Sequence, residues 1–260
     1  MDITKVTIYC FTGTGNTLLV AQEMLRTFAE KGLETRLFRM ERADPARVPL
    51  DGLLGLAFPV AGQTTFPLVW RFARALPSAQ GTPIFMVDTM MAFSGGVVGP
   101  LRRVVEKKGY RPIGAQEIVM PNNFSPLKID EEKNRIKITR GLAKAQRYAQ
   151  DLLDGRARWG HVPVLPDLLY AILGSPFLWR ISGAIGQRFV LEQDKCSRCG
   201  LCEELCPLGN ISLDPYPQFG PHCQLCQRCI AFCPTEAIHL PWLKHERYRA
   251  VRAAEILELP

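Results

Sequence analysis

Eight of the nine cysteines form two strings of identical spacing near the C-terminus. In each string the cysteines follow one another at intervals of three, three and four residues, and a proline follows the last cysteine. The first string is Cys196, Cys199, Cys202 and Cys206; the second is Cys223, Cys226, Cys229 and Cys233. An iron–sulfur cube needs a thiolate at each of four iron corners, and this spacing is typical of chains that hold two [4Fe-4S] clusters. The strings therefore predict one-electron redox chemistry.

Two other interpretations of the cysteines are weaker. A disulfide framework needs an oxidising compartment and is usual in small secreted chains. Paired zinc sites rarely use a third cysteine at this spacing followed by Cys-Pro. The ninth cysteine, Cys10, ends an apolar run and is expected to fill the core.

A second chemical signal lies at the N-terminus, in the segment Thr12-Gly13-Thr14-Gly15-Asn16-Thr17. It follows an apolar strand-like run and opens a helix-like pattern, whose free N–H groups and positive dipole end suit a phosphate. The dinucleotide fingerprint lacks its third glycine because that position is Leu18, and the Gly-Lys-Ser/Thr of nucleoside-triphosphate loops is absent. A plain glycine turn is the remaining alternative.

The elements that must position these residues alternate over positions 1–155. Apolar runs predict strands that are buried on both faces, at Thr7–Phe11, Leu33–Met40, Leu53–Phe58, Ile84–Val87 and Ile118–Met120. The segments between them have helical patterns, at Thr17–Glu30, Pro67–Leu76, Val97–Lys108 and Glu131–Leu153. Five strands with intervening helices predict an α/β, doubly wound, five-stranded parallel sheet, with ligands outside the carboxyl ends of the strands.

Three further segments complete the predicted organisation. Residues 156–191 include an uncharged run of 12 residues between Asp167 and Arg180, too short to span a membrane. We interpret them as an apolar linker that packs between domains, with partner docking and membrane-surface contact as alternatives. Residues 192–240 form the cluster domain, and residues 241–260 a helical extension.

The phosphate loop after the first strand resembles that of flavodoxins, and the alternating strands and helices match that fold. Together with two ferredoxin-type cysteine strings, the chain resembles the flavodoxin-domain-containing ferredoxins of anaerobic prokaryotes. The resemblance implies FMN, with its phosphate held by the segment from Thr12 to Thr17, including Gly13, Thr14, Gly15 and Asn16.

The same resemblance implies that loops after later strands flank the flavin ring. The loop after the third strand contributes Pro59, Val60, Ala61 and Gly62; the loop after the fourth contributes Thr89, Met90, Phe93 and Gly95; and the loop after the fifth contributes Asn123 and Phe124. Many flavodoxins sandwich the flavin between a tryptophan and a tyrosine, which are absent from the first two of these loops. Phe93 and Phe124 are thus the candidate ring neighbours, with core packing as the alternative for each.

Resemblance to bacterial ferredoxins also implies a small α+β domain and how the ligands divide between its two clusters. Cys196, Cys199, Cys202 and Cys233 would hold one cluster, and Cys223, Cys226, Cys229 and Cys206 the other. Pro207 and Pro234 restrict the preceding cysteines away from helix.

The formal charge of +7 is unevenly distributed. Residues 1–160 carry 23 basic against 15 acidic side chains, whereas residues 191–240 carry 3 against 6. Two oxidised clusters at about −2 each and a phosphate monoester at about −2 would offset most of the excess. We therefore expect no nucleic-acid partner, and the absence of a signal peptide together with reduced cysteines indicates the cytoplasm.

These patterns favour an electron-transfer protein with FMN, two [4Fe-4S] clusters and a protein redox partner. One alternative is an FMN-dependent reductase that acts on a small substrate, with the clusters as electron supply. A second alternative is a binding or regulatory module that keeps the clusters and has lost flavin. The absence of a recognisable nicotinamide site weakens the first alternative, and the intact Thr-Gly-Thr-Gly-Asn-Thr loop weakens the second.

Overall fold

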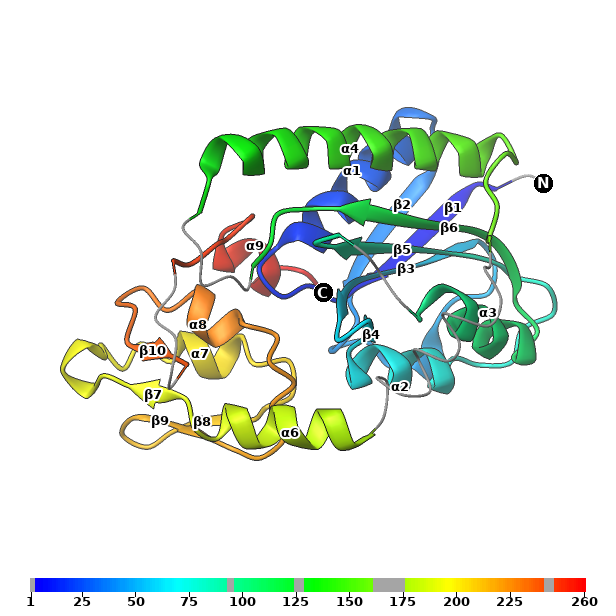
Figure 1. Ribbon diagram of the computed structural model, residues 1–260. Helices are drawn as coiled ribbons and strands as arrows, with labels where there is room; N and C mark the ends of the chain where they lie inside the picture. Colours follow the sequence, from blue (N-terminus) through cyan, green and yellow to red (C-terminus); the bar gives the residue numbers. More distant parts are fainter. Residues whose placement is uncertain (1–2, 93–95, 124–128, 161–175, 241–245) are drawn as a thin grey trace.

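The computed structural model describes residues 3–92, 96–123, 129–160, 176–240 and 246–260, and Figure 1 shows two unequal parts in contact. The larger part is a parallel sheet with helices on both faces. The smaller part, yellow to orange in Figure 1, holds the cysteine strings and lies at one end of the sheet.

The sheet has the strand order β2-β1-β3-β5-β6, with every neighbouring pair parallel. Its strands are β1 (Lys5–Cys10), β2 (Glu34–Arg39), β3 (Leu53–Ala61), β5 (Pro83–Met90) and β6 (Arg111–Val119). A two-residue strand, β4 (Thr64–Thr65), pairs antiparallel with the end of β3. Apart from β4, this is the flavodoxin-like order, so the predicted doubly wound parallel sheet is confirmed.

Helices cover the two faces of the sheet in pairs, as Figure 1 shows. On one face α1 (Asn16–Glu30) packs with α4 (Glu131–Leu153), burying Met24 and Phe28 against Phe85. On the other face α2 (Pro67–Ala75) and α3 (Val98–Lys107) bury Val69 and Leu101. Apolar side chains repeat along each helix at three- and four-residue intervals, which places them on one buried stripe.

The sequence predicts the central strands more accurately than the two edge strands of the sheet. β6 begins at Arg111, seven residues before the apolar run at Ile118 that predicted it. As an edge strand it is only partly buried, and so is β2, so neither carries a continuous apolar run. The expectation that all five strands are buried on both faces is therefore wrong for these two.

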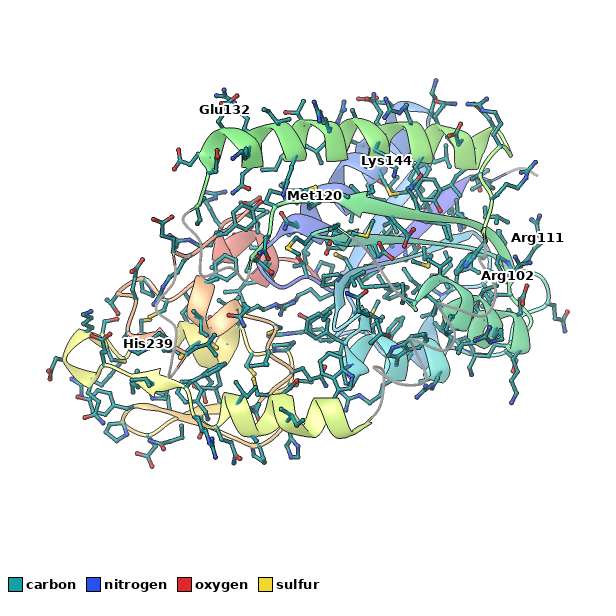
Figure 2. All side chains as sticks on the ribbon, viewed as in Figure 1. Arg102, Arg111, Met120, Glu132, Lys144 and His239 are labelled. Carbon is teal, nitrogen blue, oxygen red and sulfur yellow. The ribbon has the colours of Figure 1, made fainter. Side chains whose placement is uncertain are left out.

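The smaller part is built from short elements. It contains α6 (Pro176–Gly186), β7 (Val190–Leu191), α7 (Leu201–Glu204), β8 (Ile211–Leu213), β9 (Pro217–Phe219), α8 (Arg228–Ala231) and β10 (Ile238–His239), with a 3-10 turn at Gln193–Lys195. β7 pairs with β10, and β8 pairs with β9, both antiparallel. Figure 2 shows His239 of β10 in this smaller part, whereas Lys144 of α4 lies in the larger part.

The 27-residue cysteine repeat is also a repeat of backbone conformation. Arg198 and Leu225 have φ angles of 57° and 55°, and Gly200 and Gln227 have φ angles of 78° and 70°. Each pair is separated by the repeat length, so both strings turn through left-handed residues at matching positions. Left-handed backbone is costly for residues other than glycine, so its recurrence indicates a conformation imposed by the turn.

Two segments connect the parts. In α6, Trp179 contacts Phe66 at a ring distance of 5.7 Å, while added Cβ atoms at Gly183 and Gly186 would collide with Pro221 and Cys223. The C-terminal tail carries α9 (Ala253–Leu257) and returns to the sheet, where the Arg39 N–H donates to the Pro260 carbonyl at 2.7 Å. Within the described ranges no helix is long and apolar enough to cross a membrane.

Candidate functional site

The loop between β1 and α1 is a tight, buried turn. Thr12, Thr14 and Thr17 are 3%, 2% and 0% exposed, and Gly15 caps α1 with a left-handed φ of 108°. The Gly15 N–H donates to the Thr12 hydroxyl at 3.2 Å, and the Thr17 and Thr89 hydroxyls lie 2.8 Å apart. Thr14 Oγ1 is buried with no hydrogen-bond partner. An unpaired buried hydroxyl at a helix N-terminus is suited to bind a phosphate oxygen.

Asn16 has a different setting from the threonines. Its Nδ2 donates to the Pro121 carbonyl at 2.8 Å, and its Oδ1 accepts from the Tyr248 hydroxyl at 2.7 Å. Both the nitrogen and the oxygen of the side-chain amide are thereby hydrogen-bonded within the protein. Asn16 ties the loop to the segment after β6 and to the C-terminal tail.

A cavity of about 360 Å³ opens at the carboxyl edge of the sheet, where β1 and β3 meet. Its walls include most residues predicted for the phosphate and the ring, namely Thr12, Gly13, Thr14, Asn16, Thr17, Pro59, Val60, Ala61, Gly62, Thr89, Met90 and Asn123. Gly15 does not line the cavity; it shapes the turn. Phe93, Gly95 and Phe124 lie outside the described residues.

The cavity also has a wall that sequence reasoning missed, formed by Leu225, Cys226 and Gln227 of the second cysteine string. Contact between the two loops is close: a Cβ atom added to Gly13 would lie 2.6 Å from the Cys226 carbonyl oxygen. Leu225, Cys226 and Gln227 follow the predicted ferredoxin pattern and carry no sign of a second role. Only the folded chain brings them to the phosphate loop.

Arg228 is a buried residue that stabilises this contact between the two loops. Its Nε donates to the Thr12 carbonyl at 2.8 Å, and its NH1 pairs with Glu41 at 2.6 Å and donates to the Leu205 carbonyl at 3.2 Å. The guanidinium also lies 5.2 Å from the centre of the Phe11 ring. One buried cation thus joins the end of β1, the end of β2 and the cluster domain.

The C-terminal tail holds the same loop from another side. The Ala250 N–H donates to the Thr14 carbonyl at 2.8 Å, and a Cβ atom added to Gly15 would lie 2.5 Å from the Val251 side chain. Consecutive loop residues from Thr12 to Asn16 therefore contact the C-terminal third of the chain. The phosphate loop is shaped by both parts of the protein.

The cysteines line two small cavities, four to each. One is lined by Cys196, Cys199, Cys202 and Cys233, and the other by Cys206, Cys223, Cys226 and Cys229. Each cavity takes its fourth cysteine from the opposite string. The second cavity shares Leu225, Cys226 and Gln227 with the cavity at the carboxyl edge of the sheet.

Burial and nearby backbone N–H groups mark the surroundings of several of these thiols. Burial raises the pKa of Cys226 to about 12 and that of Cys202 to about 11. Such thiols ionise at neutral pH only beside strong positive charge, which bound iron supplies. Backbone N–H groups point at two sulfurs: Asn210 N lies 3.2 Å from Cys206 Sγ, and Leu225 N lies 3.3 Å from Cys223 Sγ.

A site for a single metal ion differs from a cluster site, because all of its ligands must converge on one point. Among the residues that the structure describes, no three histidine, cysteine, aspartate or glutamate side chains are placed to hold one ion. The thiolates of a [4Fe-4S] cube bind separate irons, so that convergence is not required of them.

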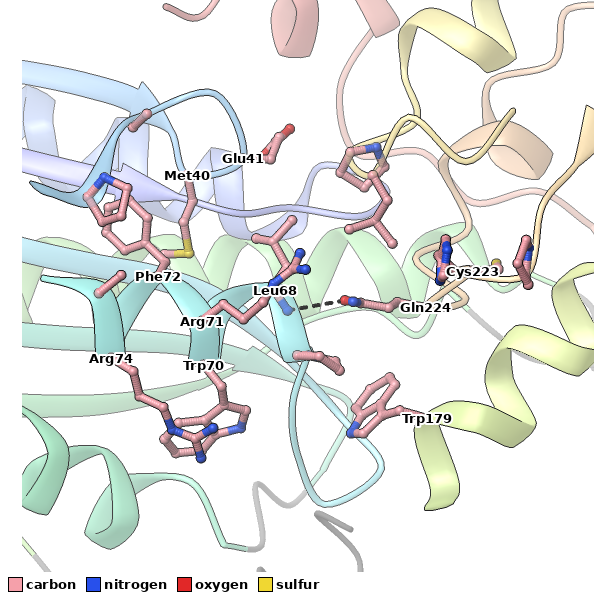
Figure 3. Close-up of a pocket in the computed structure, with 18 residues that line it drawn as sticks. Met40, Glu41, Leu68, Trp70, Arg71, Phe72, Arg74, Trp179, Cys223 and Gln224 are labelled. Atoms are coloured by element: carbon pink, nitrogen blue, oxygen red, sulfur yellow. Dashed lines mark hydrogen bonds between the residues drawn. The ribbon is translucent and has the colours of Figure 1, made fainter. Parts of the chain in front are cut away.

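A larger cleft, drawn in Figure 3, adjoins the second cysteine cavity and shares Cys223 and Gln224 with it. Trp70, Arg71 and Arg74 of α2 line it opposite Trp179 and Cys223. Gln224 bridges the two sides by accepting a hydrogen bond from the Leu68 N–H at 3.2 Å. Cys223 thus lies at a junction between the parts.

Comparison with known proteins agrees with the first cysteine string. A family model described as a 4Fe-4S binding domain matches residues 189–212. The polyferredoxin protein MvhB of Methanothermus fervidus is 35% identical over 60 residues, which are 22% of this chain and 13% of that protein. The chain therefore matches only a small part of that relative's length.

Solved structures similar to the larger part include two flavodoxins. The Streptococcus pneumonia TIGR4 flavodoxin is 16% identical, with a TM-score of 0.44 over 58% of this chain and 97% of its own. The Megasphaera elsdenii flavodoxin is 22% identical, with a TM-score of 0.39 over 55% and 98%. With the strand order and the family match, the chain combines a flavodoxin-like domain and a 4Fe-4S ferredoxin domain.

Proposed function

We propose that this chain is an iron–sulfur flavoprotein that relays electrons between FMN and two [4Fe-4S] clusters, and exchanges them with a protein partner. The observation that carries the proposal is the shared wall: Leu225, Cys226 and Gln227 line both the cavity at the carboxyl edge and one cysteine cavity. A flavin and a cluster in these two cavities would be separated by a single loop. Such proximity favours electron transfer between them.

The cysteine groupings support a ligand assignment. We assign Cys196, Cys199, Cys202 and Cys233 to the distal cluster, and Cys206, Cys223, Cys226 and Cys229 to the proximal cluster beside the phosphate loop. Each cluster supplies one-electron chemistry, and FMN supplies one- or two-electron chemistry. The protein residues bind and orient these groups and exclude water from the path between them.

The threonines of the first loop support FMN rather than a cluster-only module. Thr14 Oγ1 has no partner within the protein, and Thr12 and Thr17 are buried beside it. The loop carries no lysine or arginine, so backbone N–H groups and hydroxyls would hold the phosphate monoester. Pro59, Val60, Thr89 and Met90 would then flank the ring.

Exposure favours the distal cluster as the point of exchange with a partner. Cys199 is exposed, whereas Cys226 faces the phosphate loop. Electrons from a partner would enter at the distal cluster, pass to the proximal cluster and reach FMN, or follow the reverse order. We propose a cytoplasmic setting because eight ligand thiols must stay reduced.

Cofactor content tests the proposal first. Protein purified and reconstituted without oxygen is expected to contain about eight iron atoms, about eight labile sulfides and one FMN per chain. Half of that iron would contradict two clusters. Failure to bind FMN would identify a cluster-only module.

Turnover then separates an electron carrier from a reductase. We expect a reduced ferredoxin to reduce the bound flavin without any small acceptor. Rapid flavin reduction by NAD(P)H, coupled to reduction of a small substrate, would instead favour the reductase. When cysteines of the two strings are replaced, a Cys10→Ala variant serves as the control. It loses a cysteine that lies outside both strings and is buried in the sheet.

A further inference from the structure

Gln227 differs from its counterpart in the first cysteine string. Both residues have left-handed backbone, with φ of 70° at Gln227 and 78° at Gly200. Glycine adopts this conformation without a steric penalty, whereas a residue with a Cβ atom does not. The second string therefore keeps a strained glutamine where the repeat has glycine. Strain of this kind clusters at functional sites.

The side chain of Gln227 is also incompletely satisfied. The residue is 6% exposed, and its Nε2 donates to the Leu225 carbonyl at 3.4 Å. Its Oε1 is buried and accepts no hydrogen bond. A buried carbonyl oxygen without a donor is costly, and such atoms are usually paired in a complete site.

Gln227 lines the cavity that we assign to FMN. In the sequence it lies between Cys226, a ligand assigned to the proximal cluster, and Arg228, which joins the two parts of the protein. We infer that Gln227 Oε1 is a flavin-binding group, which accepts a hydrogen bond from an N–H or O–H of FMN. This inference rests on the proposed function. It adds a binding residue from the ferredoxin domain to a site otherwise built at the edge of the sheet.

The chain offers a variant that separates binding from backbone strain. Gln227→Gly removes the amide and relieves the left-handed strain, so it is expected to fold at least as well as the parent. FMN affinity of the cluster-loaded protein is nevertheless expected to fall about fivefold to tenfold, the effect of one lost hydrogen bond. Gln227→Asn keeps an amide in a residue that tolerates this backbone and is expected to restore part of the affinity.

Arg198→Gly is the matched control, because Arg198 is a left-handed residue of the first string and lines the distal cavity only. It also relieves strain, and it is expected to leave FMN affinity unchanged. Affinity is measured by quenching of flavin fluorescence, with iron counted in each variant. Equal affinity of Gln227→Gly and the parent would overturn the inference, whereas a parent that binds no FMN would overturn the proposed function instead.

A second ligand identifies the donor. Oxidised flavin has one ring N–H, at N3, which is absent from 3-methyl-FMN. If Gln227 binds that group, the Gln227→Gly effect disappears with 3-methyl-FMN; if it binds a ribityl hydroxyl, the effect persists. Provided that Gln227→Gly weakens the binding of unmodified FMN, either result with 3-methyl-FMN supports the role of Gln227 as a hydrogen-bond acceptor.

Discussion

Arg228 and Glu41 form an ion pair of 2.6 Å at the junction of the two domains, with side chains only 2% and 4% exposed. Glu41 follows the end of β2, and Arg228 opens α8 beside the proximal cysteine cavity. The pair therefore links an edge of the flavodoxin-like sheet to the ferredoxin domain. Since Arg228 also binds the Thr12 carbonyl, the same contact determines where the phosphate loop lies.

Removing one partner of this pair is expected to destabilise the whole protein. Arg228→Met leaves the Glu41 carboxylate buried without its cation, and the free energy of unfolding is expected to fall by about 3–5 kcal/mol. The double variant Arg228→Met with Glu41→Leu is expected to recover most of that loss. Urea unfolding measures both. Arg26→Met, which breaks exposed pairs with Glu23 and Glu30, serves as control and is expected to leave stability nearly unchanged.

Gly13 is expected to tolerate no side chain, because of its contact with the ferredoxin domain. The Cβ atom of Gly13→Ala would lie 2.6 Å from the Cys226 carbonyl oxygen, so the two loops must separate. We expect about tenfold weaker FMN binding, measured by flavin fluorescence. Gly160→Ala meets nothing within 4 Å and should bind FMN like the parent. Normal FMN binding by Gly13→Ala would contradict the close contact.

Loss of the proximal cluster is expected to weaken FMN binding more than loss of the distal one. Cys223 and Cys196 hold matching positions in the two strings, but of the two cysteine cavities only the proximal one shares its wall with the cavity that we assign to FMN. FMN affinity should therefore fall further in Cys223→Ser than in Cys196→Ser. Titration of both reconstituted variants with FMN measures this. Equal affinities would show that the proximal loop keeps its shape without iron.

Asp88 is expected to make the stability of the protein depend on pH. It is fully buried in β5 and both carboxylate oxygens lack hydrogen-bond partners. Burial, and secondarily the neighbouring Glu117, raises its pKa well above the ordinary value. Lys144, which is labelled in Figure 2 and donates to the Glu117 backbone carbonyl, opposes the shift. Because the folded pKa is raised, the contribution of Asp88 to the free energy of unfolding is complete below the unfolded pKa and is lost progressively as the pH rises to the folded pKa.

Asp88→Asn removes this ionisation. Its advantage over the parent is expected to be small near pH 4 and to grow by about 1.4 kcal/mol for each pH unit up to the folded pKa. Urea unfolding at several pH values checks the slope. Asp214→Asn, at an exposed position, should show no such trend. A parent and an Asp88→Asn variant with parallel pH profiles would indicate that Asp88 is charged in the folded state.

The sequence predicts the central parts of the fold because the information there is local. The apolar run before Thr12 and the helical pattern after Thr17 are enough to predict a strand, a turn and a helix. The wall formed by Gln227 could not be predicted, because it depends on how two domains meet, and neither Gln227 nor Arg228 differs in type from ordinary loop residues. The edge strands β2 and β6 are harder to predict from the sequence than β3, because a partly buried strand lacks a continuous apolar run.

The most direct test of the relay is the rate at which a reduced ferredoxin donor reduces the bound flavin in an anaerobic stopped-flow experiment. The measurement compares the parent, Cys196→Ser and Cys223→Ser at saturating FMN, so that flavin occupancy is the same in all three. We predict that both variants fall to the slow rate of protein without clusters, because each loses one link of a linear path. Flavin reduction in Cys223→Ser as fast as in the parent would contradict a path through the proximal cluster.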